Sequence, residues 1–391
     1  MRLKIQLKPE TFYIVFAFLY FSISNISRML QSIGLPRPVS YIIFLAFFLV
    51  FFLKTVRRIK LVDVVYYAIA IPLVALALIR YGSYESSETA IYAIIILFLP
   101  SYYFFRFCRL EYMQKGFKYA AVYSFLYLLF YYVTDVYGGS YSMQYAYWMA
   151  QPVCVLAYYA MKERKKSYFI AALVGMVTIF VSGSRGALFL CLACCAFTYL
   201  AFYKVRKKVA VRVVVLLILS GVLLLYADSL VVFLSGNADI SRNIRLLLSG
   251  EFFESKSRAK LYEICQQFID AKPFGQGPLA SRKLLPDYPY PHSIWYEFQL
   301  DYGKWLGIGM ILLLAYISIQ NLIFYRKTDM LIVCSVVTVI SLCGLIVSSS
   351  YWQEYCVPAE IALFVNQCII KKQRTKTERL HRDNKGRQKG K

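Results

Sequence analysis

Long apolar runs recur along almost the whole chain, and they constrain its fold more than any other feature. An α-helix of about 20 apolar residues crosses the hydrocarbon core of a bilayer and satisfies its own backbone hydrogen bonds there. A large soluble all-α protein would need a polar face on each helix, which these runs lack. We therefore expect an all-α, polytopic integral membrane protein with about 12 transmembrane helices. They are expected at residues 12–30, 39–53, 61–79, 89–105, 117–134, 142–161, 168–183, 186–203, 209–232, 293–325, 330–347 and 356–370.

The formal net charge of +24 is distributed as in a membrane protein rather than as in a nucleic-acid-binding protein. Cationic side chains gather in alternate connections between the apolar runs, and such clusters also attract anionic lipid. By the positive-inside rule, both termini are cytoplasmic and the protein lies in the inner (cytoplasmic) membrane. The cytoplasmic clusters are Lys54, Arg57, Arg58 and Lys60; Arg106, Arg109, Lys115 and Lys118; Lys162, Arg164, Lys165 and Lys166; Lys204, Arg206, Lys207 and Lys208; and Arg326 and Lys327.

This reading divides the chain into four parts. Residues 1–232 form transmembrane helices 1–9, and residues 233–292 form one long extracytoplasmic loop with helical segments. Residues 293–370 form transmembrane helices 10–12, and the basic residues 371–391 form a cytoplasmic tail that is expected to be disordered. The basic N-terminus leads directly into the first apolar run without a small-residue cleavage site, so this run is expected to anchor the chain.

Nine of the ten cysteines lie in or beside apolar runs, which does not indicate a disulfide framework. Cys191, Cys194 and Cys195 have a spacing seen at metal sites, but no second cysteine pair or histidine accompanies them in sequence. We therefore expect buried packing residues and neither a metal nor a cofactor. Two carboxyl residues begin spans: Asp63 is expected to favour a helix N-terminus, and Glu360 to pair with a neighbouring helix or to mark a functional position.

A short outer turn between two apolar runs carries Arg185 within the sequence Val-Ser-Gly-Ser-Arg-Gly-Ala, residues 181–187. A guanidinium group can bind two phosphate oxygens at once, and the small neighbours leave backbone amides accessible to the same anion. The alternative is an interfacial arginine that reaches lipid headgroups. Arg185 is therefore a candidate phosphate-binding residue.

The long loop has a helical segment followed by a turn. Leu261, Ile264, Phe268 and Ile269 recur at helical spacing, and the basic residues Arg258 and Lys260 begin this segment. The sequence Pro-Phe-Gly-Gln-Gly at residues 273–277 then predicts a tight turn.

His292 follows two prolines and precedes an aromatic helix that is expected to begin near Ser293. Glu297 and Asp301 lie four residues apart and therefore on one face of that helix. They are candidates to orient His292 or to bind a sugar hydroxyl, and the alternative is a pair of solvated carboxylates at the membrane interface. Two or more arginines and a histidine at the outer edge of a bilayer suit a lipid-anchored diphosphate as substrate. The arginines would hold the diphosphate and stabilise it as it leaves, while His292 would accept a proton from an attacking hydroxyl.

The motifs resemble the O-antigen ligase and polymerase superfamily of bacterial surface-polysaccharide enzymes. They are Ser-Gly-Ser-Arg-Gly-Ala at 182–187, Ser-Arg-Ala-Lys-Leu-Tyr at 257–262 with Pro-Phe-Gly-Gln-Gly, and His-Ser-Ile-Trp at 292–295 running to Gly303. The resemblance covers mainly residues 168–325. In that family the last motif usually reads His-Asn, so Ser293 is a departure.

The resemblance implies an inverting, metal-independent transfer of a glycan from a polyprenyl-diphosphate carrier to an acceptor hydroxyl. Arg185 and Arg258 would then bind the diphosphate, with Lys260, Glu297 and Asp301 as further substrate contacts, and His292 would activate the acceptor. Repeat-unit polymerase is favoured over ligase, with chain-length regulators and flippases as partners. A transporter of lipid-linked oligosaccharide remains the alternative from another class, although no internal repeat supports it.

Overall fold

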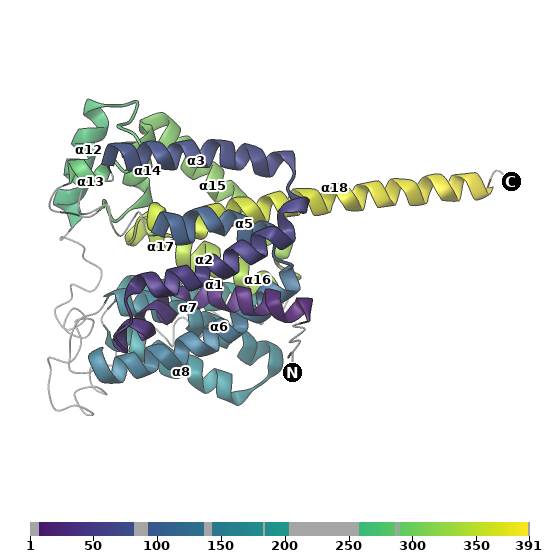
Figure 1. Ribbon diagram of the computed structural model, residues 1–391, viewed down its shortest axis with the longest axis horizontal. Helices are drawn as coiled ribbons and strands as arrows, with labels where there is room; N and C mark the ends of the chain where they lie inside the picture. The colour runs from purple at the N-terminus through teal and green to yellow at the C-terminus, as the bar shows by residue number, and fades with distance from the viewer. Residues whose placement is uncertain are drawn as a thin grey trace, which may run out of the picture.

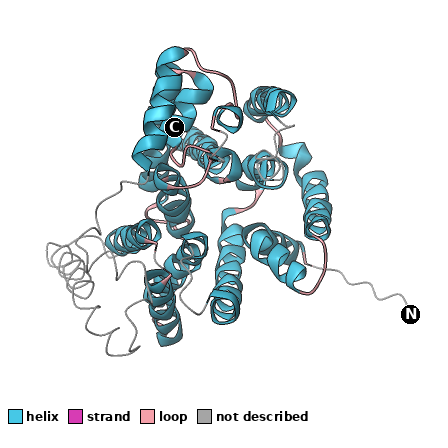
Figure 2. Ribbon diagram, turned by 90° about the vertical axis from the view of Figure 1, so that its left-hand side faces the viewer, coloured by secondary structure: helices cyan, strands magenta, loops and turns pink. Residues whose placement is uncertain are grey.

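The computed structural model describes residues 8–81, 93–136, 143–182, 184–202, 258–285, 288 and 290–389, and every regular element among these residues is helical. Figures 1 and 2 show a bundle of roughly aligned helices, with α12, α13 and α14 together at one end and the last part of α18 projecting from the other. Within these described ranges, five helices are long and apolar enough to cross a membrane, and three shorter apolar helices accompany them. The chain is therefore a polytopic helical membrane protein.

Helices occupy every expected span among the described residues, whereas the expected span 209–232 lies outside them. Their order follows the apolar runs of the sequence. The elements that span or line the bundle are α1 (Pro9–Ser32), α2 (Arg37–Thr55), η1 (Val56–Arg58), α3 (Leu61–Tyr81), η3 (Ile94–Phe98), α5 (Leu99–Phe107), α6 (Leu110–Tyr131), η4 (Tyr132–Val136), α7 (Met143–Glu163), α8 (Lys166–Val181), α9 (Arg185–Phe202), α15 (Lys304–Tyr325), α16 (Leu331–Ser335), η6 (Val336–Leu342), α17 (Gly344–Val347) and α18 (Cys356–Lys389).

Two segments differ from the structure expected from the sequence. The segment 293–325 is not one span but two helices, α14 (Ile294–Tyr302) and α15, because Gly303 adopts φ +89° and breaks the helix between them. Residues 371–389, expected to form a disordered tail, continue α18 as a helix through Lys389. They include many Lys, Arg and Gln residues, which are good helix formers.

Aromatic side chains and close helix contacts build the core. Tyr20 of α1 stacks on Phe104 of α5 with ring centroids 4.0 Å apart. Gly116 of α6 lies so close to α1 that an added Cβ would be 2.4 Å from the Cβ of Ala17. Small residues that let two helices approach in this way are typical of membrane bundles.

Buried polar groups inside the bundle are paired between helices. Glu360 of α18 accepts hydrogen bonds from the Asn321 amide at 2.7 Å and the Thr338 hydroxyl at 2.6 Å. Pairing with neighbouring helices therefore accounts for this carboxyl group. At the start of α3, Asp63 accepts a hydrogen bond from the Lys60 backbone N–H at 2.8 Å, as expected for a helix N-terminus, and also pairs with Arg106 at 2.8 Å.

The cysteines pack more closely than their spacing in the sequence suggests. Cys154 of α7 places its sulfur 3.5 Å from that of Cys191 and 3.9 Å from that of Cys195, both on α9. Three thiols thus lie at one helix contact, with a partner from α7 that the local sequence pattern did not reveal. Cys154 and Cys191 are buried and Cys195 is partly buried, where α7 packs on α9.

Candidate active site at the head of α14

The described part of the long loop folds into a small unit against α14. In it α12 (Ala259–Ala271) buries Leu261, Cys265 and Ile269 against Leu285 and Leu300. Tyr262 of α12 also stacks on Tyr296 of α14, with ring centroids 4.7 Å apart. The helical segment predicted from the apolar spacing is confirmed, and none of α12, α13 (Ser281–Leu284) and α14 belongs to a candidate membrane span.

The Pro-Phe-Gly-Gln-Gly turn is docked at the break between α14 and α15. The backbone N–H groups of Gln276 and Gly277 donate to the carbonyl oxygens of Leu300 and Asp301 at 2.8 and 3.0 Å, and the Lys304 N–H donates to the Pro273 carbonyl at 2.9 Å. The turn therefore satisfies backbone groups that the end of α14 and the start of α15 would otherwise leave without partners.

Glycine is required on both sides of this contact. A Cβ on Gly275 would lie 2.5 Å from the Gly303 nitrogen, and a Cβ on Gly303 would lie 2.5 Å from the Pro273 carbonyl oxygen. Both residues also have positive φ, +87° and +89°. The obstacles are backbone atoms, so no side chain can move aside to make room.

His292 lies two residues before the start of α14. Ser293 separates it from Ile294, the first residue of the helix. Its φ of +57° is uncommon for a residue with a side chain, and such conformations concentrate at functional sites. The imidazole lies against the Tyr290 ring with centroids 4.3 Å apart. Its Nδ1 atom is buried and has no hydrogen-bond partner among the described residues.

Two arginines flank this histidine. The Arg282 guanidinium lies 5.3 Å from the centroid of the Tyr290 ring, on which His292 also rests. Burial, followed by the charges of Arg258 and Arg282, lowers the pKa of His292 to about 4. The imidazole is therefore neutral at pH 7 and surrounded by positive charge, an arrangement that attracts an anion and leaves the imidazole able to accept a proton.

Arg282 was not singled out by sequence reasoning. It lies on the four-residue helix α13 with only 2% of its surface exposed. Burial lowers its pKa, while the charges of Glu297 and Asp301 act in the opposite direction. The signal that could have identified it is the pair of cations Arg282 and Lys283 within the otherwise uncharged stretch 279–285, directly after the glycine turn.

Glu297 and Asp301 are not solvated interfacial carboxylates. They are 1% and 3% exposed, and burial raises their pKa values to about 7 and about 6. Glu297 accepts hydrogen bonds from the Ser350 hydroxyl at 2.5 Å and the Tyr351 N–H at 3.2 Å. Asp301 accepts from the Tyr351 hydroxyl at 2.6 Å, the Trp352 indole at 3.0 Å and the Leu279 N–H at 3.3 Å. Glu297 thus connects α14 to the start of η7 (Tyr351–Gln353). Asp301 connects α14 both to η7 and to the segment before α13.

The remaining predicted residues lie at helix starts. Arg258 directly precedes α12, and its guanidinium contacts the sulfur of Met143, the first residue of α7, at 3.9 Å. Arg185 is the first residue of α9, whose N-terminus is capped by a hydrogen bond from the Ala187 N–H to the Ser184 hydroxyl at 3.4 Å. Because α8 returns from the far end of α7, the starts of α7 and α9 lie at the same end of the bundle.

The structure therefore brings Arg258, Arg282, Tyr290 and His292 together and places Arg185 at the same end of the bundle. Lys260 lies exposed in the first turn of α12. Each of Arg185, Arg258 and His292 stands at or just before a helix N-terminus, where backbone N–H groups favour an anion.

The bundle and this site define a multi-pass membrane protein with a cationic, histidine-containing site at one end. Residues 169–308 match the model of a protein family described as O-antigen ligase, which confirms the resemblance over that part of the chain. The matched segment contains Arg185, Arg258, Arg282 and His292. Comparison with curated proteins and with solved structures found no match.

Proposed function

We propose that the protein is a membrane glycosyltransferase that moves a glycan from a polyprenyl-diphosphate carrier to an acceptor hydroxyl during assembly of a bacterial surface polysaccharide. The observation that carries this proposal is the neutral imidazole of His292 beside Arg258 and Arg282. The match of residues 169–308 to the O-antigen ligase family supports the same reaction class. Repeat-unit polymerase is the preferred activity, and ligation to another glycolipid or to a protein is the alternative outcome of the test below.

In the proposed reaction, the acceptor oxygen attacks the anomeric carbon of the donor. The bond between that carbon and the diphosphate oxygen breaks, and the diphosphate leaves with the electron pair. Arg185, Arg258 and Arg282 stabilise the charge of the departing group, and the imidazole of His292 receives the hydroxyl proton. Lys260, which is exposed in the first turn of α12 two residues after Arg258, would contact the edge of the diphosphate.

Binding of the donor would also adjust the base. Burial and then the charges of the two arginines lower the pKa of His292. An anionic diphosphate between them offsets their charge, so the pKa of His292 rises toward the working pH once the donor is bound. The imidazole thus becomes an effective base when a substrate is present.

Glu297 and Asp301 have a positioning role in this proposal. Their hydrogen bonds hold α14, and their charges act on Arg282. They keep a buried arginine charged and in place, rather than serving as direct sugar ligands. The cationic groups take the part that a divalent metal plays in many glycosyl transfers.

The test uses the purified full-length protein in detergent with a polyprenyl-diphosphate-linked repeat unit as the only substrate. A ladder of longer lipid-linked glycans is the expected result, and EDTA should leave it unchanged. Arg282→Gln should abolish the ladder, while Lys283→Gln, an exposed neighbour on the same short helix, should retain it. Transfer only after a second glycolipid or protein is supplied would establish a ligase. Movement of intact lipid-linked glycan between leaflets without any transfer would replace the enzyme with a transporter.

A further inference from the structure

A basic pocket lies at the other end of the bundle, far from His292. It has a volume of about 310 Å³ and lies where η1, the end of α5 and the middle of α18 meet. Arg80, near the end of α3, donates to the Gln276 carbonyl at 3.4 Å in the turn that docks on α14, whereas Lys60, just before α3, lines the basic pocket. The two sites are thus separated by the length of α3, 21 residues or roughly 30 Å. The pocket is lined by Arg58, Lys60, Arg106, Phe107, Cys108, Arg109, Leu110, Asn366 and Ile370.

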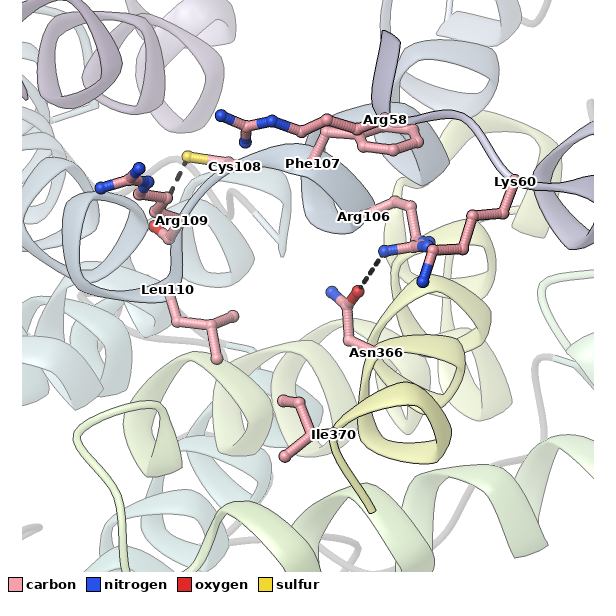
Figure 3. A pocket seen from close by; sticks show the side chains of 9 residues that line it. All are labelled: Arg58, Lys60, Arg106, Phe107, Cys108, Arg109, Leu110, Asn366 and Ile370. Atoms are coloured by element: carbon pink, nitrogen blue, oxygen red, sulfur yellow. Dashed lines mark hydrogen bonds between the residues drawn. The ribbon is translucent and has the colours of Figure 1, made fainter. Parts of the chain in front are cut away.

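Four of the lining residues are cations and none is a carboxylate. Figure 3 shows the Lys60 and Arg106 side chains on the same side of the pocket, with Arg106 held by Asn366. The Arg106 side chain is 8% exposed and is fixed by Asp63 at 2.8 Å and by the Asn366 side-chain oxygen at 2.7 Å. A rigid guanidinium among further cations, with its own carboxylate turned away from the pocket lining, is suited to an anion.

An apolar groove continues from this pocket along α3. It has a volume of about 450 Å³ and is lined almost wholly by apolar surface of α3 and α5. Phe107 lines both cavities, and the ion pair of Asp63 with Arg106 joins their walls. The groove residues are Ile59, Asp63, Val64, Tyr67, Ala68, Ile71, Pro72, Tyr103 and Phe107.

We infer that the pocket and groove together form a binding site for one anionic membrane phospholipid. The phosphate headgroup lies among Arg58, Lys60, Arg106 and Arg109, and one hydrocarbon tail follows the groove beside Ala68 and Ile71. Charge complementarity selects the headgroup, and the apolar groove that opens from the same wall requires a ligand with a tail. A free phosphate ion would bind in the basic pocket but would not occupy the apolar groove.

The experiment is native mass spectrometry of the full-length protein titrated with dioleoyl phosphatidylglycerol or dioleoyl phosphatidylcholine. The anionic lipid should bind more tightly. The double variant Arg58→Gln, Lys60→Gln should weaken phosphatidylglycerol binding about 25-fold, because each cation near an anionic headgroup contributes a factor of roughly five. The matched control is Arg57→Gln, since Arg57 is exposed beside Arg58 but does not line the pocket. Binding of phosphatidylglycerol by the double variant with unchanged affinity would overturn the assignment.

A second pair of variants tests the tail. Ala68→Trp fills the groove and should weaken phosphatidylglycerol binding at least tenfold, whereas Val65→Trp, at an exposed position of α3 outside the groove, should not. Millimolar inorganic phosphate should not displace the lipid. Full displacement by phosphate together with no effect of Ala68→Trp would identify a site for a free anion and overturn the lipid assignment. Thermal unfolding midpoints of all variants, which lie at exposed positions, check that the bundle remains folded.

Discussion

At His292 the chain combines a left-handed backbone with a half-buried, neutral imidazole. The sequence predicted the position of this residue and the start of α14 from the flanking prolines. It could not reveal the positive φ, because nothing in the local pattern requires a histidine to adopt that conformation. It also missed Arg282, whose proximity depends on how α13 folds back toward α14. It left open whether Glu297 and Asp301 are solvated, because their burial depends on a segment about 50 residues later.

Substitutions of His292 should distinguish its role as the catalytic base from the effect of its backbone conformation on stability. His292→Asn, His292→Gly and His292→Ala should each abolish the glycan ladder, because each removes the base. Only the alanine variant should lose stability from its backbone, by about 1 kcal/mol, because Asn and Gly tolerate positive φ and Ala does not. Thermal unfolding in detergent measures this difference. Equal midpoints for the alanine and glycine variants would contradict the left-handed conformation.

The pKa of His292 predicts a dependence of stability on pH. Its folded-state pKa is about 4 against an ordinary value of 6.5, so the unfolded chain binds more protons between these two values. The contribution of His292 is therefore fully favourable above about pH 6.5 and is lost as the pH falls toward 4. The unfolding midpoint of the wild type should fall relative to that of His292→Asn over this window. A constant difference from pH 7 to pH 4 would show that the imidazole is not held neutral.

At the scale of elements, the apolar runs and turn residues predicted most of the helices. The spacing of Leu261 and Ile269 predicted α12, and the Pro-Phe-Gly-Gln-Gly motif predicted a turn. The partner of that turn was not predictable, because Gly303 meets Gly275 through tertiary packing rather than through neighbouring residues. For the same reason the sequence predicts one span over 293–325, since Gly303, Gly307 and Gly309 permit a bend or close helix packing in an apolar run without indicating a break.

Gly303→Ala should disrupt the unit formed by α12, α13 and α14. The added methyl group would meet the Pro273 carbonyl and the backbone of Phe274, and the positive φ would be strained as well. We expect loss of activity and increased protease sensitivity of the segment 258–285. The matched control is Gly309→Ala on α15, where an added Cβ meets nothing within 4 Å and a helix former replaces glycine. Activity of Gly303→Ala equal to that of Gly309→Ala would show that the turn does not dock at this break.

At the scale of the whole molecule, the basic connections that the structure describes gather at one end of the bundle, as their alternation in the sequence predicted, while the basic residues 204–208 lie outside the described residues. Lys162, in the last turn of α7, pairs with Asp329, between α15 and α16, at 2.5 Å. The candidate active site lies at the opposite end, with Phe274 91% exposed at the tip of the docked turn. By the positive-inside rule we expect this end to face outward.

Cysteine labelling in intact cells tests this orientation. With the exposed Cys368 replaced by serine, Phe274→Cys should react with a membrane-impermeant maleimide, and Lys327→Cys should react only after the membrane is permeabilised. The two positions are exposed at opposite ends of the bundle, so each serves as the control for the other. The reverse pattern of labelling would place His292 on the cytoplasmic side, where an extracytoplasmic glycan could not reach it.

The reciprocal fit of Gly275 and Gly303 has a consequence for how such chains diverge. A side chain at either position meets backbone of the other segment, so no compensating replacement at the opposite glycine can restore the fit. The two glycines should therefore persist or disappear as a pair during evolution, together with the turn that they join. Distant homologues are best recognised by this linked pair placed on either side of a histidine, because a match to either short motif alone arises easily by chance.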